Sequence, residues 1–309
     1  MTTSPTASPA PPTSTERDWS LAAMGVTVLL WASAFVGIRA VADVFEPGPL
    51  SLGRLLVGAL ALVVLARPWR HRLPRGRTLA LVVVYGVLWF GAYNVALNAG
   101  ETYLDAGTAA LVVNIGPILI ALLAGIVLKE GFPRPLVVGM AVAFAGVVLI
   151  ATSTRHDTSV QTASTTGVLL CVLAAVLYAV GALTQKPTLR TVAPAMSVWM
   201  ACTIGAVVCL PFAPALVDQV GSASAGDVAW LVYLGVFPTA IGFTTWSYAL
   251  RRLSAGQVAS TTYLVPAVAT LISWVLLGEV PAPLAFVGGA LCLLGVAITR
   301  LRRRGAATS

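Results

Sequence analysis

The chain has 309 residues, of which 58% are hydrophobic and only 10% charged, and its mean hydropathy is +0.90. A soluble domain averages about 25% charged residues, so this composition excludes one and indicates a membrane protein. The net charge of +8 does not indicate a nucleic-acid partner, because the basic residues fall in short loops between apolar segments. The four cysteines lie inside apolar segments without metal-ligand spacing. We therefore expect no metal, no cofactor and no disulfide framework.

The predicted elements begin with residues 1–18, a tail rich in Pro, Ser and Thr that we expect to be disordered. Ten apolar segments follow, each close to the about 20 residues that a helix needs to cross a bilayer. They lack the alternation of barrel strands. The sequence thus predicts an all-α, multi-pass protein of the plasma or inner membrane, whose ten transmembrane helices cover about 20–38, 49–66, 78–98, 105–128, 134–152, 166–185, 195–214, 227–249, 255–277 and 282–299.

An internal repeat divides these segments into two sets of five. The stretch from Leu104 to Ile150 recurs without a gap 149 residues later, with 13 of 47 positions identical. A period of this length indicates two copies of a half-molecule, as in secondary transporters. We assign residues 19–153 to repeat 1, 154–165 to a linker, 166–300 to repeat 2 and 301–309 to a basic tail.

Loop cations predict the orientation of both copies. With the N-terminus inside, sixteen Lys and Arg residues lie in inner segments, against only Arg39 and Arg155 outside. The positive-inside rule therefore places both termini in the cytoplasm. Five spans per copy force the second copy into the membrane upside down. Thr102 in an outer loop accordingly corresponds to Arg251 in an inner one.

Several motifs occur in both copies at fixed spacing. Copy 2 carries Trp246-Ser247-Tyr248-Ala249-Leu250, Leu253-Ser254-Ala255, Pro266, Gly278-Glu279, Gly288 and Gly295; copy 1 carries Trp31-Ala32-Ser33-Ala34-Phe35, Arg54, Pro117, Lys129-Glu130, Gly139 and Gly146. With these motifs the sequence resembles the drug/metabolite transporter (DMT) superfamily, specifically an EamA family transporter with two EamA domains. The resemblance covers nearly the whole chain, from about Leu21 to Arg300.

The resemblance implies a ten-helix inner-membrane carrier with cytoplasmic termini and a central cavity, which moves small metabolites, often outward. One departure lies in the second copy of the span 1 motif, where Tyr178 stands at a position that is commonly tryptophan. This departure weakens the transfer of site detail from that helix more than it weakens the fold.

Two prolines mark the expected centre of the molecule. Pro117 and Pro266 lie near the middle of the fourth and ninth spans, where proline removes a backbone donor and kinks a helix. Such a kink can be purely structural, but its occurrence at equivalent places in both copies favours a gate. Asn114 and Tyr263 each precede a proline by three residues, and we expect both near the freed backbone and the substrate.

Aromatic and polar residues in other spans are further candidates for the substrate site. In the third span, Trp89 and Asn94 lie near the centre, where lining a cavity is favoured over interfacial belts or interhelical hydrogen bonds. For Tyr85 and Asn98, near its ends, the latter roles are favoured. Tyr93 is a candidate on the same helix face as Trp89. The remaining candidates are Trp31, Ser33, Tyr178 and Trp246. Trp31 and Tyr178 correspond at an offset of 147, which predicts opposite walls of one site.

Other features have structural interpretations. Gly139, Gly146, Gly288 and Gly295 predict close helix packing, with a homodimer face as the alternative. Glu130 is expected to cap the next helix or pair with a cation. Arg54 could attract a substrate carboxylate, but its position near the end of a span favours snorkelling to the interface.

The sequence therefore predicts an alternating-access transporter of a small metabolite, an exporter of amino acids or related compounds. Export of amphipathic drugs or other metabolites, or channel-like facilitation, are the alternatives. An intramembrane enzyme is disfavoured because no nucleophile with its base, metal-ligand cluster or carboxylate pair is visible within a span. No Asp, Glu or His lies mid-span, so exchange or facilitated diffusion is favoured over proton coupling unless Glu101 or Asp105 faces inward. The expected partners are substrate and lipid, and the protein is a monomer or a homodimer.

Overall fold

The computed structural model describes residues 14–103, 112–153, 165–277 and 283–299, and every regular element in these ranges is helical. Most of the tail and linker, the basic tail, Asp105 and Glu279 fall outside the described residues. Copy 1 comprises α1 (Ser14–Val41), α2 (Pro47–Ala66), η1 (Pro68–Arg70), α3 (Gly76–Tyr85), η2 (Gly86–Ala92), α4 (Tyr93–Glu101), α6 (Gly116–Val127) and α7 (Arg134–Ser153).

The described elements of copy 2 follow a similar order. It comprises α8 (Thr165–Thr188), α9 (Pro194–Cys209), η3 (Leu210–Phe212), α10 (Ala213–Ser222), α11 (Ala225–Leu234), η4 (Gly235–Gly242), α12 (Phe243–Arg252), α13 (Ala255–Thr261), α14 (Leu264–Leu277) and α15 (Pro283–Thr299). The short helix α10 was not predicted from the sequence. α1 begins at Ser14, inside the stretch that was expected to be a tail.

Six helical stretches in the described residues are long and apolar enough to cross a membrane. They are Asp18–Ile38, Pro47–Ala66, Gly76–Glu101, Thr165–Thr188, Pro194–Ser222 and Ala225–Arg252. Shorter apolar helices cover Gly116–Val127, Arg134–Leu149 and Phe286–Thr299. The prediction of a helical, multi-pass membrane protein is confirmed.

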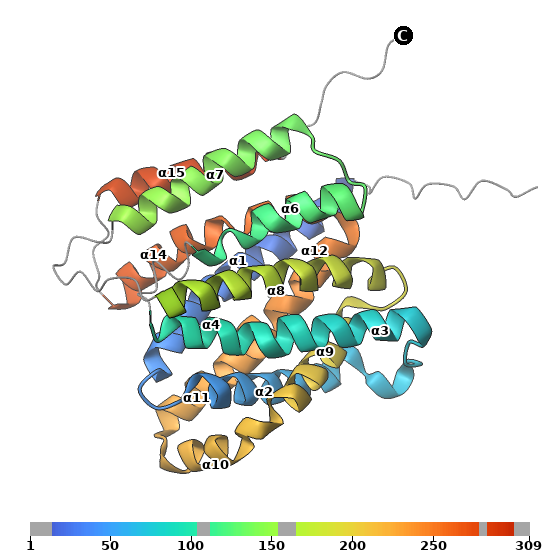
Figure 1. The fold of residues 1–309 in the computed structure, drawn as a ribbon, viewed down its shortest axis with the longest axis vertical. Coiled ribbons are helices and arrows are strands. Elements are labelled where there is room, and N and C mark those ends of the chain that lie inside the picture. The colour runs from blue at the N-terminus through green and yellow to red at the C-terminus, as the bar shows by residue number, and fades with distance from the viewer. Residues whose placement is uncertain (1–13, 104–111, 154–164, 278–282, 300–309) are drawn as a thin grey trace, which may run out of the picture.

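The two copies are interleaved rather than set side by side. Their contacts come in exchanged pairs: α4 packs on α8 as α1 packs on α12, η2 packs on α9 as η4 packs on α2, and α6 packs on α8 as α14 packs on α1. Equivalent helices also pack on each other, α2 on α9 and α7 on α15, and Figure 1 shows the latter pair side by side at one end of the stack. The core is therefore built mainly between the copies.

The α7–α15 pair shows why these helices need glycine. A Cβ on Gly139 would lie 2.5 Å from the carbonyl oxygen of Gly295, and one on Gly146 would lie 2.5 Å from that of Gly288. The close helix packing expected from the four glycines is confirmed. Residue numbers rise along one helix as they fall along the other, so these equivalent helices run antiparallel.

This packing gives a stability prediction. Gly295→Ala would place a Cβ 2.4 Å from the backbone nitrogen of Ala143, which cannot move aside as a side chain can. We expect the free energy of unfolding to fall by about 1 to 3 kcal/mol, the usual cost of overpacking. Gly289→Ala, in the same helix, is the control because its Cβ would meet only the Ala267 Cβ at 3.7 Å. Equal denaturation midpoints in detergent for both variants would contradict the prediction.

Candidate functional site

A cluster of aromatic rings lies where the two copies meet. Trp31 of α1 stacks on Trp246 of α12 with ring centroids 5.1 Å apart and an interplanar angle of 27°. Trp89 of η2 lies 5.3 Å from Tyr178 of α8 and 5.8 Å from Trp246. The cluster is completed by Phe90, Tyr93 and Phe243. We call these seven residues the aromatic cluster.

The structure thus brings together five of the nine predicted substrate-site residues. Trp31, Trp89, Tyr93, Tyr178 and Trp246 all belong to the aromatic cluster. The edge of Trp31 faces Tyr178 at a centroid distance of 6.5 Å, so the two positions related by the 147-residue offset lie on opposed helices. Phe90 and Phe243 were not singled out from the sequence, where nothing distinguishes them from lipid-facing phenylalanines.

Glycines on neighbouring helices make room for three of these rings. A Cβ on Gly181 would lie 2.4 Å from the Cβ of Trp89, and a Cβ on Gly116 would lie 2.7 Å from Cδ1 of Tyr178. A Cβ on Gly242 would lie 3.0 Å from the indole nitrogen of Trp31. Each ring therefore occupies space that a side chain at a glycine of the other copy would fill.

Five of the seven cluster residues are buried, Trp31 and Tyr93 are partly exposed, and three polar atoms in the cluster lack hydrogen-bond partners. Trp89 is 1% exposed and Trp246 is fully buried. The indole nitrogens of Trp31 and Trp246 and the hydroxyl of Tyr178 are buried without a hydrogen-bond partner. Buried polar groups in native proteins are almost always paired, so these three groups make the aromatic cluster a candidate ligand site.

Two π-helical turns border the cluster at equivalent places in the two copies. η2 begins at Gly86 and η4 at Gly235, 149 residues later, and each joins two α-helices of one long span. π-helical turns are rare and concentrate at functional sites. η4 contains Pro238, which cannot donate a backbone hydrogen bond. The matching glycines and this proline are the sequence signals for these turns.

Both predicted kinks coincide with breaks in the helices. α6 begins one residue before Pro117, and a turn at Thr262 and Tyr263 separates α13 from α14 just before Pro266. Tyr178 adjoins both breaks, because its ring packs on Gly116 at the start of α6 and its helix, α8, also packs on α13. The aromatic cluster therefore adjoins both interrupted helices.

The other predicted site residues lie around the cluster or away from it. Asn94 is buried and donates a hydrogen bond from Nδ2 to the carbonyl of Phe90 at 2.8 Å. Asn114 lies in the turn before α6. Tyr263 packs against Phe144 in a separate core beside α7 and α15, with its hydroxyl unpaired. Ser33 forms a 2.7 Å hydrogen bond with Tyr233, which is not one of the cluster residues.

Tyr85 and Asn98 form interhelical hydrogen bonds, the role that their positions near the span ends favoured. The Tyr85 hydroxyl lies 2.7 Å from Oγ of Ser197, and Nδ2 of Asn98 donates to Oγ of Ser51 at 2.9 Å.

Arg54 differs from the expectation of a snorkelling side chain. It is 6% exposed, and its Nε donates to Oγ1 of Thr239 in η4 at 3.1 Å. Thr239 in turn donates to the carbonyl of Leu234, five residues earlier. The guanidinium points into the bundle because α2 packs against η4, so it supports a π-helical turn instead of reaching the membrane surface.

The EamA-like transporter family matches this chain twice, over residues 19–152 and 165–301. The chain belongs to the EamA-like transporter family. As a member, it is a membrane transporter of the DMT type, located in the plasma or inner membrane. Relatives of the chain are named as transporters or exporters.

Curated relatives of this EamA-like transporter match over most of their length. A "Probable terminal-alkyne amino-acid exporter" of Streptantibioticus cattleyicolor is 40% identical over 92% of this chain and 94% of its own length. The "Uncharacterized transporter YdfC" of Bacillus subtilis is 33% identical, with 88% of each chain covered. A "Probable amino-acid metabolite efflux pump" of Salmonella typhimurium is 27% identical over 90% of this chain and 95% of its own.

A solved crystal structure has the same fold. It superposes with a TM-score of 0.76 and 20% sequence identity, and the match covers 93% of this chain and 99% of the other. At this identity the likeness extends to the arrangement of helices and not to the chemistry of the site.

A second polar feature of this EamA-like transporter joins the copies at one end of the bundle. The Glu130 carboxylate of copy 1 lies 2.8 Å from Nζ of Lys186 at the end of α8. The same carboxylate accepts hydrogen bonds of 2.8 and 3.1 Å from the backbone nitrogen of Ala255, at the start of α13. Glu130 thus both pairs with a cation and caps a helix, but the helix belongs to the other copy.

This tie gives a second prediction. Glu130→Gln removes the ion pair but keeps an acceptor for Ala255, whereas Glu130→Ala removes both. We expect the free energy of unfolding to fall in that order, by about 1 to 3 kcal/mol for Glu130→Ala, since partly buried charge-assisted bonds are lost. Glu46→Ala is the control, because Glu46 is exposed and its side chain forms no cap bond. If chemical denaturation shows that Glu130→Ala lowers the free energy of unfolding no more than the control does, the stabilising role of Glu130 is refuted.

Proposed function

We propose that this protein is an alternating-access exporter of amino acids or related small metabolites. It has ten membrane-spanning helices in two inverted halves, with both termini in the cytoplasm. The observation that carries the proposal is the aromatic cluster between the copies, with its unpaired indole and hydroxyl groups. The printed names of two relatives refer to amino-acid or amino-acid metabolite export, and the antiparallel α7–α15 pair supports the inversion.

The chemistry of the cluster suits an amino acid with a small apolar side chain. Aromatic faces bind apolar and unsaturated groups, while the indole nitrogens of Trp31 and Trp246 can donate to a carboxylate. The Tyr178 hydroxyl both donates and accepts, so it can accept a hydrogen bond from an ammonium group. The substrate therefore has one apolar end and one zwitterionic end.

Alternating access requires the aromatic cluster to open on one side at a time. Glu130 and Lys186 close the side at which α8 ends, because they join copy 1 to copy 2 there. The turns at η2 and η4 and the breaks before Pro117 and Pro266 provide flexible points within the long spans. Rocking of one copy against the other about these points exposes the cluster to either face of the membrane.

Glu101 favours proton coupling over simple exchange. It lies at the end of α4, and one of its carboxylate oxygens is buried without a hydrogen-bond partner. Because this oxygen is buried, that side of the carboxylate faces the interior of the bundle. A buried carboxylate is the usual proton carrier in transporters. The sequence argued against proton coupling unless Glu101 or Asp105 faces inward, and the orientation of Glu101 supports such coupling.

Transport by purified protein in liposomes tests the proposal. Liposomes loaded with an amino acid that has a terminal alkyne side chain should release it faster than protein-free liposomes, with saturation and competition by leucine. Conductance far above carrier rates would instead indicate a channel. Release of neither compound by folded protein, or release only of amphipathic dyes, would refute amino-acid export.

Tryptophan variants test the role of the indole nitrogens. Trp31→Phe and Trp246→Phe keep an aromatic ring but remove the donor, and loss of a hydrogen bond to a charged group costs about 1.5 to 3 kcal/mol. We expect the apparent affinity for the amino acid to weaken at least about tenfold in each. Trp230→Phe is the control because Trp230 packs outside the cluster. Unchanged affinity in both cluster variants would place the carboxylate elsewhere.

A proton gradient tests the role of Glu101. We expect an inward proton gradient to accelerate efflux in the wild-type protein, and we expect Glu101→Gln to abolish this acceleration while exchange of labelled for unlabelled amino acid continues. Exchange requires only that the loaded carrier reorients, so it controls for folding and binding. An equal response to the gradient in both proteins would remove Glu101 from the coupling mechanism.

A further inference from the structure

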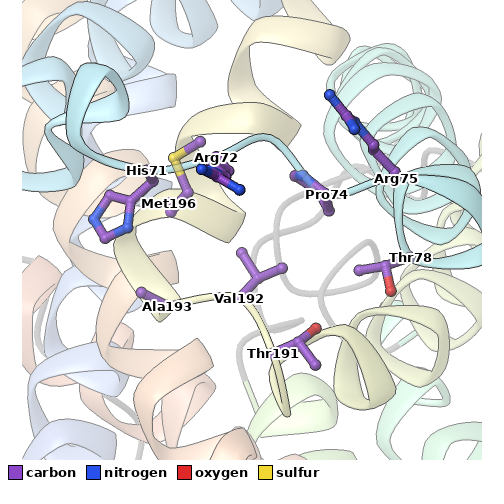
Figure 2. A pocket seen from close by; sticks show the side chains of 9 residues that line it. All are labelled: His71, Arg72, Pro74, Arg75, Thr78, Thr191, Val192, Ala193 and Met196. Carbon is purple, nitrogen blue, oxygen red and sulfur yellow. The ribbon is translucent and has the colours of Figure 1, made fainter.

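A cavity lies at one end of the bundle, away from the aromatic cluster. It has a volume of about 270 Å³ and is bordered by residues of two loops: His71, Arg72, Pro74, Arg75, Thr78, Thr191, Val192, Ala193 and Met196. Figure 2 shows residues 71–75 along one side of the opening and residues 191–193 along the other. Two of the lining residues, Met196 and Val192, are buried and so belong to the packed interior.

The cavity carries positive charge that nothing nearby neutralises. Residues 67–78 and 187–196, which supply its lining, contain no Asp or Glu. Within the described part of the chain, neither Arg72 nor Arg75 takes part in an ion pair or a hydrogen bond. Thr78 adds a hydroxyl at the rim. Guanidinium groups match phosphate oxygens in geometry as well as charge, so this lining suits a phosphate group.

The helix ends place the cavity at the depth of lipid headgroups. α2 ends at Ala66 and α3 begins at Gly76, so the loop between two membrane-spanning helices has only nine residues and must lie at the membrane surface. In this loop the side chains of Trp69 and Leu73 are 67% and 60% exposed, which is typical of residues that enter the interfacial layer. The cavity is smaller than the about 300 to 1,000 Å³ of pockets for drug-sized ligands, and it suits a single headgroup.

We propose that this cavity is a binding site for a phosphate group, presented by an anionic phospholipid or as a free phosphate ion. The site is separate from the aromatic cluster. Its phosphate binding does not depend on whether the protein exports an amino acid. Lipid binding is measured without transport. A negative binding result can therefore be told apart from a negative export result.

Two double variants of the same loop test the site. Arg72→Gln/Arg75→Gln removes the two arginines that line the cavity, whereas Arg70→Gln/Arg77→Gln removes two exposed arginines of the same loop that do not line it. If binding depended only on the overall positive charge of the loop, both double variants would weaken it equally. All four arginines are exposed, so we expect both variants to fold, and their unliganded thermal unfolding in detergent checks this.

Binding to the full-length proteins in neutral detergent is measured by native mass spectrometry and thermal stabilisation. The probes are dioctanoyl phosphatidylglycerol, dioctanoyl phosphatidylcholine and inorganic phosphate. We expect the cavity variant to bind phosphatidylglycerol about 30-fold more weakly than wild type, from about 1 kcal/mol per arginine. The loop control should stay within about threefold, and phosphatidylcholine should bind more weakly throughout.

Each outcome decides the proposal. Arginine-dependent binding of phosphatidylglycerol alone identifies a membrane lipid as the source, and equal dependence for inorganic phosphate identifies the free ion. Equal weakening in the two double variants, no weakening in either, or no binding by the wild-type protein would overturn the site.

Discussion

Each copy of the repeat buries its apolar helix faces on the other copy, and the remaining features of the structure depend on this constraint. Pairs such as α4 with α8 and α1 with α12 exchange the same contact between copies, so neither set of helices has a core of its own. A site at the centre of the bundle is then necessarily shared. Trp31 and Trp89 come from copy 1, Tyr178 and Trp246 from copy 2, and their rings meet because their helices do.

Irregular backbone is costly in a membrane, because lipid offers no partner for a freed carbonyl. The bundle concentrates its irregular turns around the aromatic cluster, where side chains supply the missing donors. Asn94 donates to the carbonyl of Phe90 in η2, and Thr239 donates to that of Leu234 beside η4. Arg54 then fixes Thr239 from the other copy. The polar residues around the cluster thus stabilise the distorted helices.

Much of this organisation could be predicted from the sequence, because apolar length and the repeat report helix positions directly. The pairing of Trp31 with Tyr178 followed from the repeat offset alone. The direction in which each side chain points was harder to predict. Ser33 follows Trp31 by two residues, about 200° around a helix, and so points to Tyr233 instead of the cluster. Arg54 lies near the end of its span, but sequence depth does not reveal that η4 packs beside it. The π-helical turns could have been found from Gly86 and Gly235, which are one repeat apart.

The fusion of the two copies into one chain has a consequence for recognition. A symmetric homodimer would present every residue of the site twice, whereas the linked copies have diverged. Trp246 corresponds to Leu97 at the 149-residue offset, and Arg54 corresponds to Ala201 at the 147-residue offset. The scaffold keeps its two-fold pattern of helices, while equivalent residues in and beside the candidate site differ in size and charge. Such a site can distinguish the two ends of an unsymmetrical molecule and hold it in a single orientation throughout the transport cycle.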